Sequence, residues 1–359
     1  MFLNASKNIQ GLSDEYESSF SEDFESDFAV FEEGLNHIAR YIESFESKSN
    51  EMWLVFRHEG VSLSKVIYTV EDVIDNAGEE KLETAKLVQI LRPSKWWRWL
   101  KTTEAGKQEM RIVIHQLLMA LKACHSRNVT HRDIKPENMV VCFEDAETGR
   151  CLKGVPSGDR NYTIKMRIID FGSAVDDFTM KHLYGSSGPT RAEQTFEYSP
   201  PEAFLNASWH QEPSSRRLKY DMWSVGVVIL ELILGSPSVF QISPKTQALL
   251  DPHIQGWNED LKELAYKLRS FMELCILIPG SSSNHPCGVQ MQLRDSPASW
   301  KCSEEFFSQQ IKSRDPLKTG FPDVWALRLV RRLLLWDPDD RLSVDEALDH
   351  PYFKQVPKG

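Results

Sequence analysis

Strand-like runs of residues occur in two pairs of segments, and each pair predicts an antiparallel β-hairpin. The first pair covers residues 37–45 and 51–58, separated by the turn-prone sequence ESKSN. The second covers residues 139–143 and 163–170, with a polar stretch containing Gly and Pro between them. Strand-like runs bounded by turn residues are typical of hairpins. The pattern therefore predicts one hairpin near the N-terminus and another, with a long tip, near the middle of the chain.

Residues 106–126 carry an apolar pattern with the period of a helix. Large apolar side chains recur there at i, i+4, i+7 and i+11: Met110, Ile114, Leu117 and Leu121. This spacing places them on one helix face. The sequence after Asp221 is also typical of helices. Its apolar run 222–235 is shorter than the roughly 18 residues that a membrane span needs. The run contains Glu231 and predicts a helix buried in the core.

Further signals divide the second half of the chain. Residues 279–298 are rich in Ser, Asn, Pro and Gly, and we expect them to form a surface loop. Ser343 and Glu346 form a capping box that begins a short helix, and Pro351 ends it. No internal repeat is evident.

Composition and charge narrow the classes of partner. A hydrophobic content of 41% is ordinary for a globular protein. The formal net charge of −10 argues against nucleic acid or a membrane surface as the main partner, because anionic partners are held by an excess of Lys and Arg. Much of this charge lies in residues 12–33, which hold nine Asp or Glu and no Lys or Arg. We expect residues 1–36 to be an acidic, disordered segment with a remnant of a helix.

The six cysteines contain no CxxC pair, which favours free structural thiols in a reducing compartment. We therefore expect a cytoplasmic protein, with the nucleus as an alternative. His285, Cys287 and Cys302 could form a metal site, but their spacing matches no zinc pattern and free thiols are the favoured interpretation. The polar start of the chain does not resemble a secretory signal.

Five motifs give the chain a family resemblance. They are HRDIKPEN at 131–138, DFG at 170–172, SPPE at 199–202, DMWSVG at 221–226, and Arg341 in DPDDRLS. In order and spacing they resemble the eukaryotic Ser/Thr protein kinases across residues 37–354. The resemblance implies an α+β fold with two lobes, a mainly α-helical C-lobe and an incomplete β-rich N-lobe. It also implies ATP and Mg²⁺ as cofactors and a protein Ser or Thr hydroxyl as acceptor.

The resemblance assigns catalytic roles to five residues. Asp133 matches the base that orients the acceptor hydroxyl and takes its proton. Lys135 matches the lysine that meets the γ-phosphate, and Thr195 the threonine that lies near both. Asn138 and Asp170 match the oxygen ligands of Mg²⁺. Considered singly, each is an ordinary turn or surface residue.

The adenine side is defined by weaker matches. Phe56 resembles the bulky residue behind the adenine, and Arg57 to Glu59 resemble the segment that offers backbone hydrogen bonds. Val140 would lie beneath the base. A core strand of any protein could also hold Phe56 and Val140.

Segment 170–202 resembles the activation segment. In the family, an arginine such as Arg132 pairs with a phosphorylated residue there. Thr190 is the first candidate for that residue, with Ser186 and Ser187 as rivals, and ordinary loop hydroxyls are an equally good interpretation. The resemblance further implies that Asp221 braces the catalytic loop and that the glutamate of SPPE pairs with the arginine of DPDDRLS.

Three front-lobe features of the family are absent from this sequence: a Gly-rich loop, a strand lysine and a helix glutamate. Gly11 and Gly34 stand alone, and Lys7 lies in no strand-like run. We therefore expect a truncated N-lobe, reduced to a hairpin and hinge at 37–60. The C-lobe would cover 61–354, with insertions near 70–103, 144–162 and 279–298.

Two functions remain open at this stage. The first is a Ser/Thr protein kinase, and the second is a catalytically inactive pseudokinase that serves as a scaffold. A scaffold would bind a protein partner through Trp96, Trp97 and Trp99 or through the acidic segment, although the tryptophans could instead pack on the helical lobe. The interrupted front lobe also resembles plant proteins that join a 2C-type phosphatase to a kinase domain.

Overall fold

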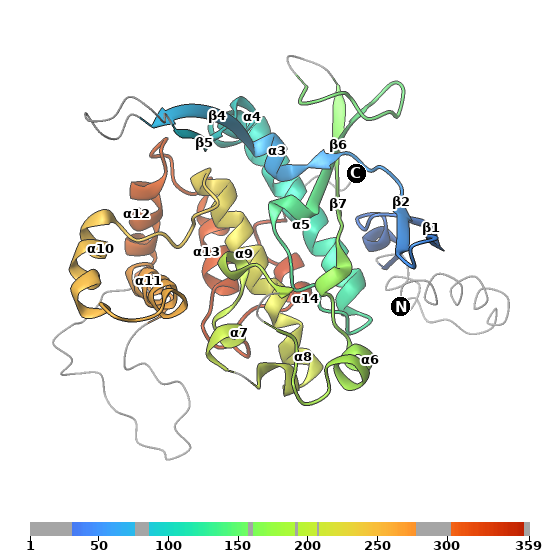
Figure 1. Ribbon diagram of the computed structural model, residues 1–359. Coiled ribbons are helices and arrows are strands. Elements are labelled where there is room, and N and C mark those ends of the chain that lie inside the picture. The colour runs from blue at the N-terminus through green and yellow to red at the C-terminus, as the bar shows by residue number, and fades with distance from the viewer. Residues whose placement is uncertain are drawn as a thin grey trace.

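The structure is a computed structural model that describes residues 31–75, 86–156, 161–190, 193–206, 208–277 and 303–354. Within these ranges long helices make the main body, and three small antiparallel sheets lie along its upper and right-hand edges in Figure 1. The architecture is therefore α+β. The expectations for residues 1–30 and for the loop at 279–298 lie outside the described residues.

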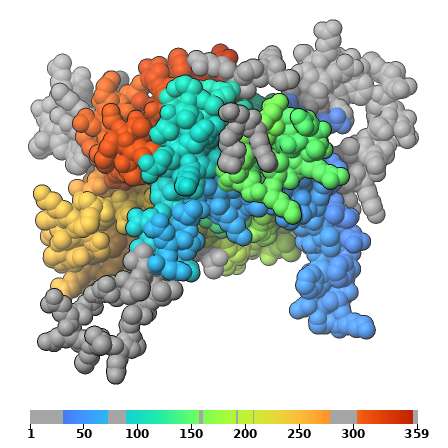
Figure 2. All heavy atoms as spheres, turned by 90° about the horizontal axis from the view of Figure 1, so that it is seen from above, coloured from blue at the N-terminus to red at the C-terminus, as the bar shows by residue number. Residues whose placement is uncertain are grey.

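The first predicted hairpin is confirmed. Strands β1 (Tyr41–Glu46) and β2 (Met52–Phe56) pair antiparallel. The hairpin stands out from the body as the blue arm in Figure 2. Large apolar side chains on it are 47–66% exposed: Ile42, Phe45, Met52, Trp53, Leu54 and Phe56. Two strands alone bury too little surface to cover both faces of such a ribbon.

A short helix at 31–35 precedes the hairpin, so the expectation of disorder is wrong for residues 31–36. Gly34 allows the close contact of this helix with α5 (Glu104–His125), because a Cβ at Gly34 would lie 2.6 Å from the Met119 carbonyl oxygen. The Phe31 ring lies 4.8 Å from the Arg127 guanidinium. Apolar packing and a cation–π contact therefore order the end of the acidic segment.

The second predicted hairpin is also confirmed and belongs to a larger sheet. Strands β6 (Met139–Asp145) and β7 (Tyr162–Ile168) pair antiparallel, and β3 (Val61–Ser62) extends the sheet in the order β3-β6-β7. Cys142 of β6 forms a disulfide with Cys151 in the hairpin tip, and Cys275 is also disulfide-bonded. The expectation of free thiols is therefore wrong for these three cysteines. Cys124 is a free, buried thiol.

The region near 70–103 contains a hairpin that the sequence analysis did not predict. Strands β4 (Tyr68–Asp75) and β5 (Lys86–Pro93) pair along all eight residues, between α3 (Leu63–Ile67) and α4 (Lys95–Thr102). Trp96 and Trp97 of α4 are 5% and 1% exposed, and Trp97 Nε1 donates to the Leu232 carbonyl oxygen at 2.8 Å. A tryptophan docking surface is therefore wrong for these two residues. They pack on the helical body, and Trp99 packs partly buried against the same core.

The helical body is centred on α9 (Lys219–Leu234), in which every residue from Tyr220 to Leu234 is buried, as predicted. Helices α5, α13 (Val324–Leu333) and α14 (Val344–Leu348) pack around it, and α14 begins with the predicted capping box. The remaining helices are α6 (Asp177–Thr179), α7 (Pro201–Leu205), α8 (Ser214–Arg217), α10 (Pro244–Leu250), α11 (Glu259–Glu273) and α12 (Glu304–Arg314). No described helix is both long enough and apolar enough to cross a membrane.

Candidate active site

The loop between α5 and β6 is built on one buried carboxylate. Asp221 of α9 accepts the backbone N–H groups of His131 and Arg132 at 2.9 and 2.8 Å, and its Oδ2 also lies 2.9 Å from His125 Nε2. Arg132 has a positive φ of 67°, a conformation that costs energy for a residue with a Cβ. The bonds to Asp221 hold the loop in this shape. The predicted brace is therefore present.

Four of the predicted site residues meet in one hydrogen-bonded network. Asn138 Nδ2 donates to Asp133 Oδ2 at 2.7 Å, and the Lys135 ammonium lies 2.8 Å from the same oxygen. The Thr195 hydroxyl donates to Asp133 Oδ1 at 2.7 Å and accepts from Lys135 Nζ at 2.7 Å. Asp133 is 8% exposed. The network fixes the direction of a nearly buried carboxylate next to a cation.

Asp170 lies at the end of β7, beside Asn138. The adjacent Ile169 N–H donates to the Asn138 carbonyl oxygen at 2.9 Å, so the two residues stand at the same end of the β6–β7 ladder. Asp170 has a left-handed backbone with φ of 63°, and its exposed carboxylate accepts the Gly172 N–H at 3.2 Å. The Phe171 ring packs 4.7 Å from that of His131. An amide and a carboxylate thus share one edge, the donor set that Mg²⁺ prefers.

The residues predicted for the adenine side lie on β2, on β6 and in the segment between β2 and β3. Phe56 is half exposed and contacts Tyr41 edge to face at 5.9 Å, and Arg57 is exposed. The Glu59 carboxylate is buried in an ion pair with Arg167 at 3.1 Å. Val140 is buried on the central strand β6 and pairs with Ser62. Residues 57–60, predicted to be the hinge, therefore lead directly into β3, whose Ser62 pairs with Val140.

Segment 170–202, predicted to be the activation segment, is held by a carboxylate that the sequence analysis missed. Arg132 is 2% exposed, donates to the Ser173 carbonyl oxygen at 3.1 Å and lies 3.8 Å from Glu193 Oε2. Glu193 also accepts hydrogen bonds from the hydroxyls of Tyr184 at 2.7 Å and Thr190 at 2.9 Å. No motif marks Glu193, because its role depends on how the segment folds back on Arg132.

Two carboxylates, of Glu202 and of the buried Glu231, join the segment to the helical body. Glu202 and Arg341 form the predicted ion pair, with two contacts at 2.8 and 3.1 Å. Glu231 accepts the hydroxyls of Tyr68 at 2.7 Å and Tyr198 at 2.5 Å. Burial raises the pKa of Glu231 to about 7, and the two tyrosine hydrogen bonds act in the opposite direction. The Glu231 cluster was not predicted, because Tyr68 belongs to the unpredicted hairpin.

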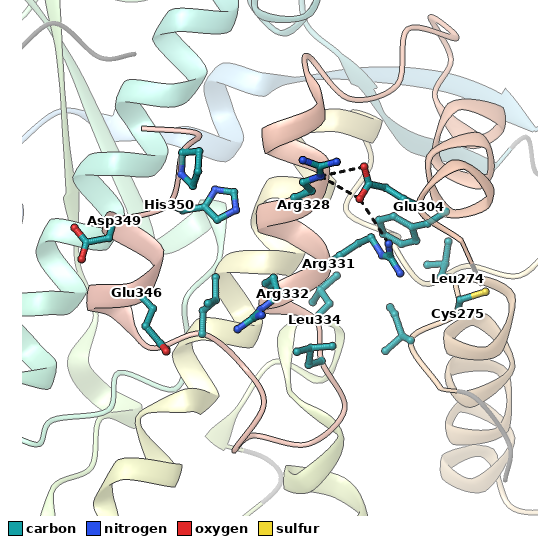
Figure 3. Close-up of a pocket in the computed structure, with 15 residues that line it drawn as sticks. Leu274, Cys275, Glu304, Arg328, Arg331, Arg332, Leu334, Glu346, Asp349 and His350 are labelled. Carbon is teal, nitrogen blue, oxygen red and sulfur yellow. Dashed lines mark hydrogen bonds and ion pairs between the residues drawn. The ribbon is translucent and has the colours of Figure 1, made fainter. Parts of the chain in front are cut away.

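A pocket of about 650 Å³ opens elsewhere, among α11, α12, α13 and α14 (Figure 3). Its apolar lining includes Leu274 and Leu334. Its charged lining consists of three arginines and three carboxylates, and Arg328 is paired with Glu304 at 3.1 Å. The opposite charges balance, so the pocket shows no preference for an ion of either sign. It contains none of the predicted site residues.

Comparison with known proteins identifies the family. The family model "Protein kinase domain" matches residues 31–353. A probable inactive protein kinase of Arabidopsis thaliana is 69% identical over 323 residues, which are 90% of this chain and 85% of that protein. Mitogen-activated protein kinase mpk-1 of Caenorhabditis elegans is 25% identical over 303 residues, 84% of this chain and 54% of that protein. Mitogen-activated protein kinase PMK1 of Pyricularia oryzae is 24% identical over 309 residues, 83% and 67% of the two chains.

The chain therefore belongs to the protein kinase family. The predicted α+β fold with two lobes is confirmed by this membership and by the arrangement of the described elements. The chain spans about half the length of its nematode relative.

Proposed function

We propose that the chain binds Mg-ATP and transfers the γ-phosphoryl group to a Ser or Thr hydroxyl of a protein. The observation that carries this proposal is the network in which Asp133, Lys135, Asn138 and Thr195 converge within hydrogen-bonding distance. A buried carboxylate of fixed direction beside a cation suits a general base next to a phosphate. We also propose that the N-lobe ends at residue 60 and the C-lobe begins at residue 61. The pairing of β3, which starts at Val61, with β6 supports this division.

In this mechanism the Asp133 carboxylate accepts a hydrogen bond from the acceptor hydroxyl and takes its proton. The hydroxyl oxygen bonds to the γ-phosphorus while the bond from that phosphorus to the ADP oxygen breaks. Lys135 offsets the negative charge of the γ-phosphate. Thr195 is hydrogen-bonded to both Lys135 and Asp133 and keeps their side chains in position. Asn138 and Asp170 would hold Mg²⁺, which neutralises phosphate charge when bound.

A second candidate is a non-catalytic protein that binds partners. Two observations favour it: the name of the Arabidopsis relative, and the absence of a Gly-rich loop and a strand lysine from these 359 residues. Without that lysine the α- and β-phosphates would lack a cation. The same Arabidopsis relative supports a plant origin, which we propose. The disulfide between Cys142 and Cys151 removes the argument from free thiols for a cytoplasmic or nuclear location.

A phosphotransfer assay distinguishes the two candidates. The purified chain is incubated with radiolabelled ATP, Mg²⁺ and myelin basic protein as acceptor. We expect Asp133→Asn to lower incorporation by about 10²-fold or more, and the exposed Asp340→Asn to leave it unchanged. Equal incorporation by wild type and Asp133→Asn would overturn the catalytic proposal. Stabilisation of wild type by Mg-ATP without transfer would favour the second candidate.

A further inference from the structure

A buried lysine of α11 lies among four phenylalanine rings. Lys267 is 5% exposed. Its ammonium nitrogen lies between 4.0 and 5.9 Å from the ring centroids of Phe196, Phe204, Phe240 and Phe271. The rings also contact one another, with centroids of Phe240 and Phe271 4.7 Å apart. The electron-rich faces of such rings attract a cation, most strongly where water is excluded.

Lys267 holds the segment that follows Thr195. Its ammonium donates to the carbonyl oxygen of Phe196 and lies 3.4 Å from that of Ser199. The two carbonyls bracket a single 3₁₀ turn (Phe196–Tyr198). Within it, the Tyr198 N–H donates to the Thr195 carbonyl oxygen at 3.1 Å and the Ser199 N–H to that of Phe196 at 3.3 Å.

The turn is directly connected to the candidate active site. Thr195, which precedes it, donates its hydroxyl to Asp133 and accepts from Lys135, both at 2.7 Å. Ser199, which follows it, donates its hydroxyl to the Thr195 carbonyl oxygen at 2.8 Å. A shift of the turn would therefore move the Thr195 hydroxyl away from the carboxylate and the ammonium that it bridges.

A cation suits this place better than a neutral side chain. An ammonium has three donors and can bind two carbonyl oxygens at once while it faces aromatic rings. Hydrogen bonds from a charged donor are stronger than those from a neutral one. A methionine would fill a similar volume but would leave both carbonyl oxygens without this donor.

We propose that Lys267 is a positioning residue for the transfer reaction: it fixes residues 195–199 so that Thr195 stays in contact with Asp133 and Lys135. The catalytic part of this inference rests on the proposed function. The positioning part concerns the turn itself and can be measured in a protein without activity.

Hydrogen exchange and kinetics test the two parts separately. In Lys267→Met we expect the Tyr198 and Ser199 amides to exchange about tenfold faster or more, the factor set by losing a charge-assisted hydrogen bond. Amides of α5 and α9 should keep their rates. In the assay described above, kcat should fall while the KM for ATP stays constant. Lys262→Met is the matched control on the same helix, because Lys262 is paired with Glu259 near the surface.

Lys267→Arg separates charge from packing, since arginine keeps the cation and the donors. Near wild-type exchange in this variant, with fast exchange in Lys267→Met, supports the inference. Unchanged exchange at Tyr198 and Ser199 in Lys267→Met overturns it, and so does a uniform rise over the whole chain in both variants, which indicates a general folding role. If wild type transfers no phosphate, the proposed function fails, while the exchange data still decide the role of Lys267.

Discussion

At the scale of single residues, Glu231 shows how burial and hydrogen bonding together set a charge state. Glu231 lies on α9, its side chain is buried, and its carboxyl group accepts hydrogen bonds from two tyrosine hydroxyls. Burial raises its pKa from 4.5 to about 7, against the effect of those hydrogen bonds. The folded protein therefore holds this proton more tightly than the unfolded chain does. This contribution to stability is complete below pH 4.5 and is lost as the pH rises to about 7.

Glu231→Gln should remove this dependence. Wild type and Glu231→Gln are compared by the difference between their free energies of unfolding, wild type minus variant. This difference should fall by about 3 kcal/mol between pH 4.5 and pH 7. Urea denaturation at several pH values measures it. Glu109, whose pKa burial also raises to about 7, is present in both proteins and cancels in the difference. Parallel pH profiles for the two proteins would contradict this account of Glu231.

The pair between Glu202 and Arg341 gives a second prediction. The Arg341 side chain is fully buried, so Glu202→Gln leaves a buried guanidinium without its carboxylate. We expect a loss of about 3 kcal/mol in the free energy of unfolding, measured by urea denaturation at pH 7.5. Glu197→Gln, in the same segment but exposed, should change it by less than about 0.5 kcal/mol. A similar small change for Glu202→Gln would show that backbone carbonyls alone satisfy Arg341.

Site residues that lie in contiguous motifs could be predicted from the sequence. Residues brought together from distant segments could not. Asp133, Lys135 and Asn138 share one short loop, and their mutual contacts follow from the spacing of that loop. Lys267 instead depends on rings from several elements. No local pattern distinguishes it from a surface lysine.

At the scale of elements, the β6–β7 hairpin carries the disulfide between Cys142 and Cys151. The bond closes a loop across nine positions of sequence separation. By loop-closure entropy, Cys151→Ser should lower the free energy of unfolding by up to about 3 kcal/mol. Peptide mapping without reductant should find residues 142 and 151 in one linked fragment. Free thiols at both positions would contradict the pairing.

The wrong predictions about the cysteines and the tryptophans have physical reasons. Spacing in sequence cannot show that Cys142 and Cys151 face each other, because their approach depends on where the hairpin tip folds back. The sequence of α4 does not show whether its tryptophans face solvent or α9. Their burial is evident only from the contact of Trp97 with Leu232. Helix α5 could be predicted because its apolar period encodes the buried side, and α9 because its continuous apolar run indicates a helix buried in the core.

At the scale of the whole molecule, the exposed β1–β2 hairpin affects behaviour in solution. Apolar side chains on a two-stranded ribbon with open edges favour self-association. Met52→Lys with Leu54→Lys should reduce association, measured by light scattering over a range of concentrations. Stability should change by no more than about 0.5 kcal/mol, because both side chains are more than half exposed.

Leu249→Lys is the control for this prediction. Leu249 is as exposed as Met52, at 66%, but lies on α10, away from the hairpin. It should leave association unchanged. An equal reduction by Leu249→Lys would mean that total surface hydrophobicity, rather than the ribbon, causes the association.

The β4–β5 hairpin has a practical consequence for engineering. Its base is anchored, since Tyr68 pairs with Pro93 and is bonded to Glu231, while Asp75 and Lys86 are register partners at the opposite end of the ladder. A foreign domain spliced between residues 75 and 86 would have its two ends held side by side by that ladder. This position is therefore suited to carrying a fluorescent reporter or an affinity module while the loop that contains Asp133 keeps its own supports.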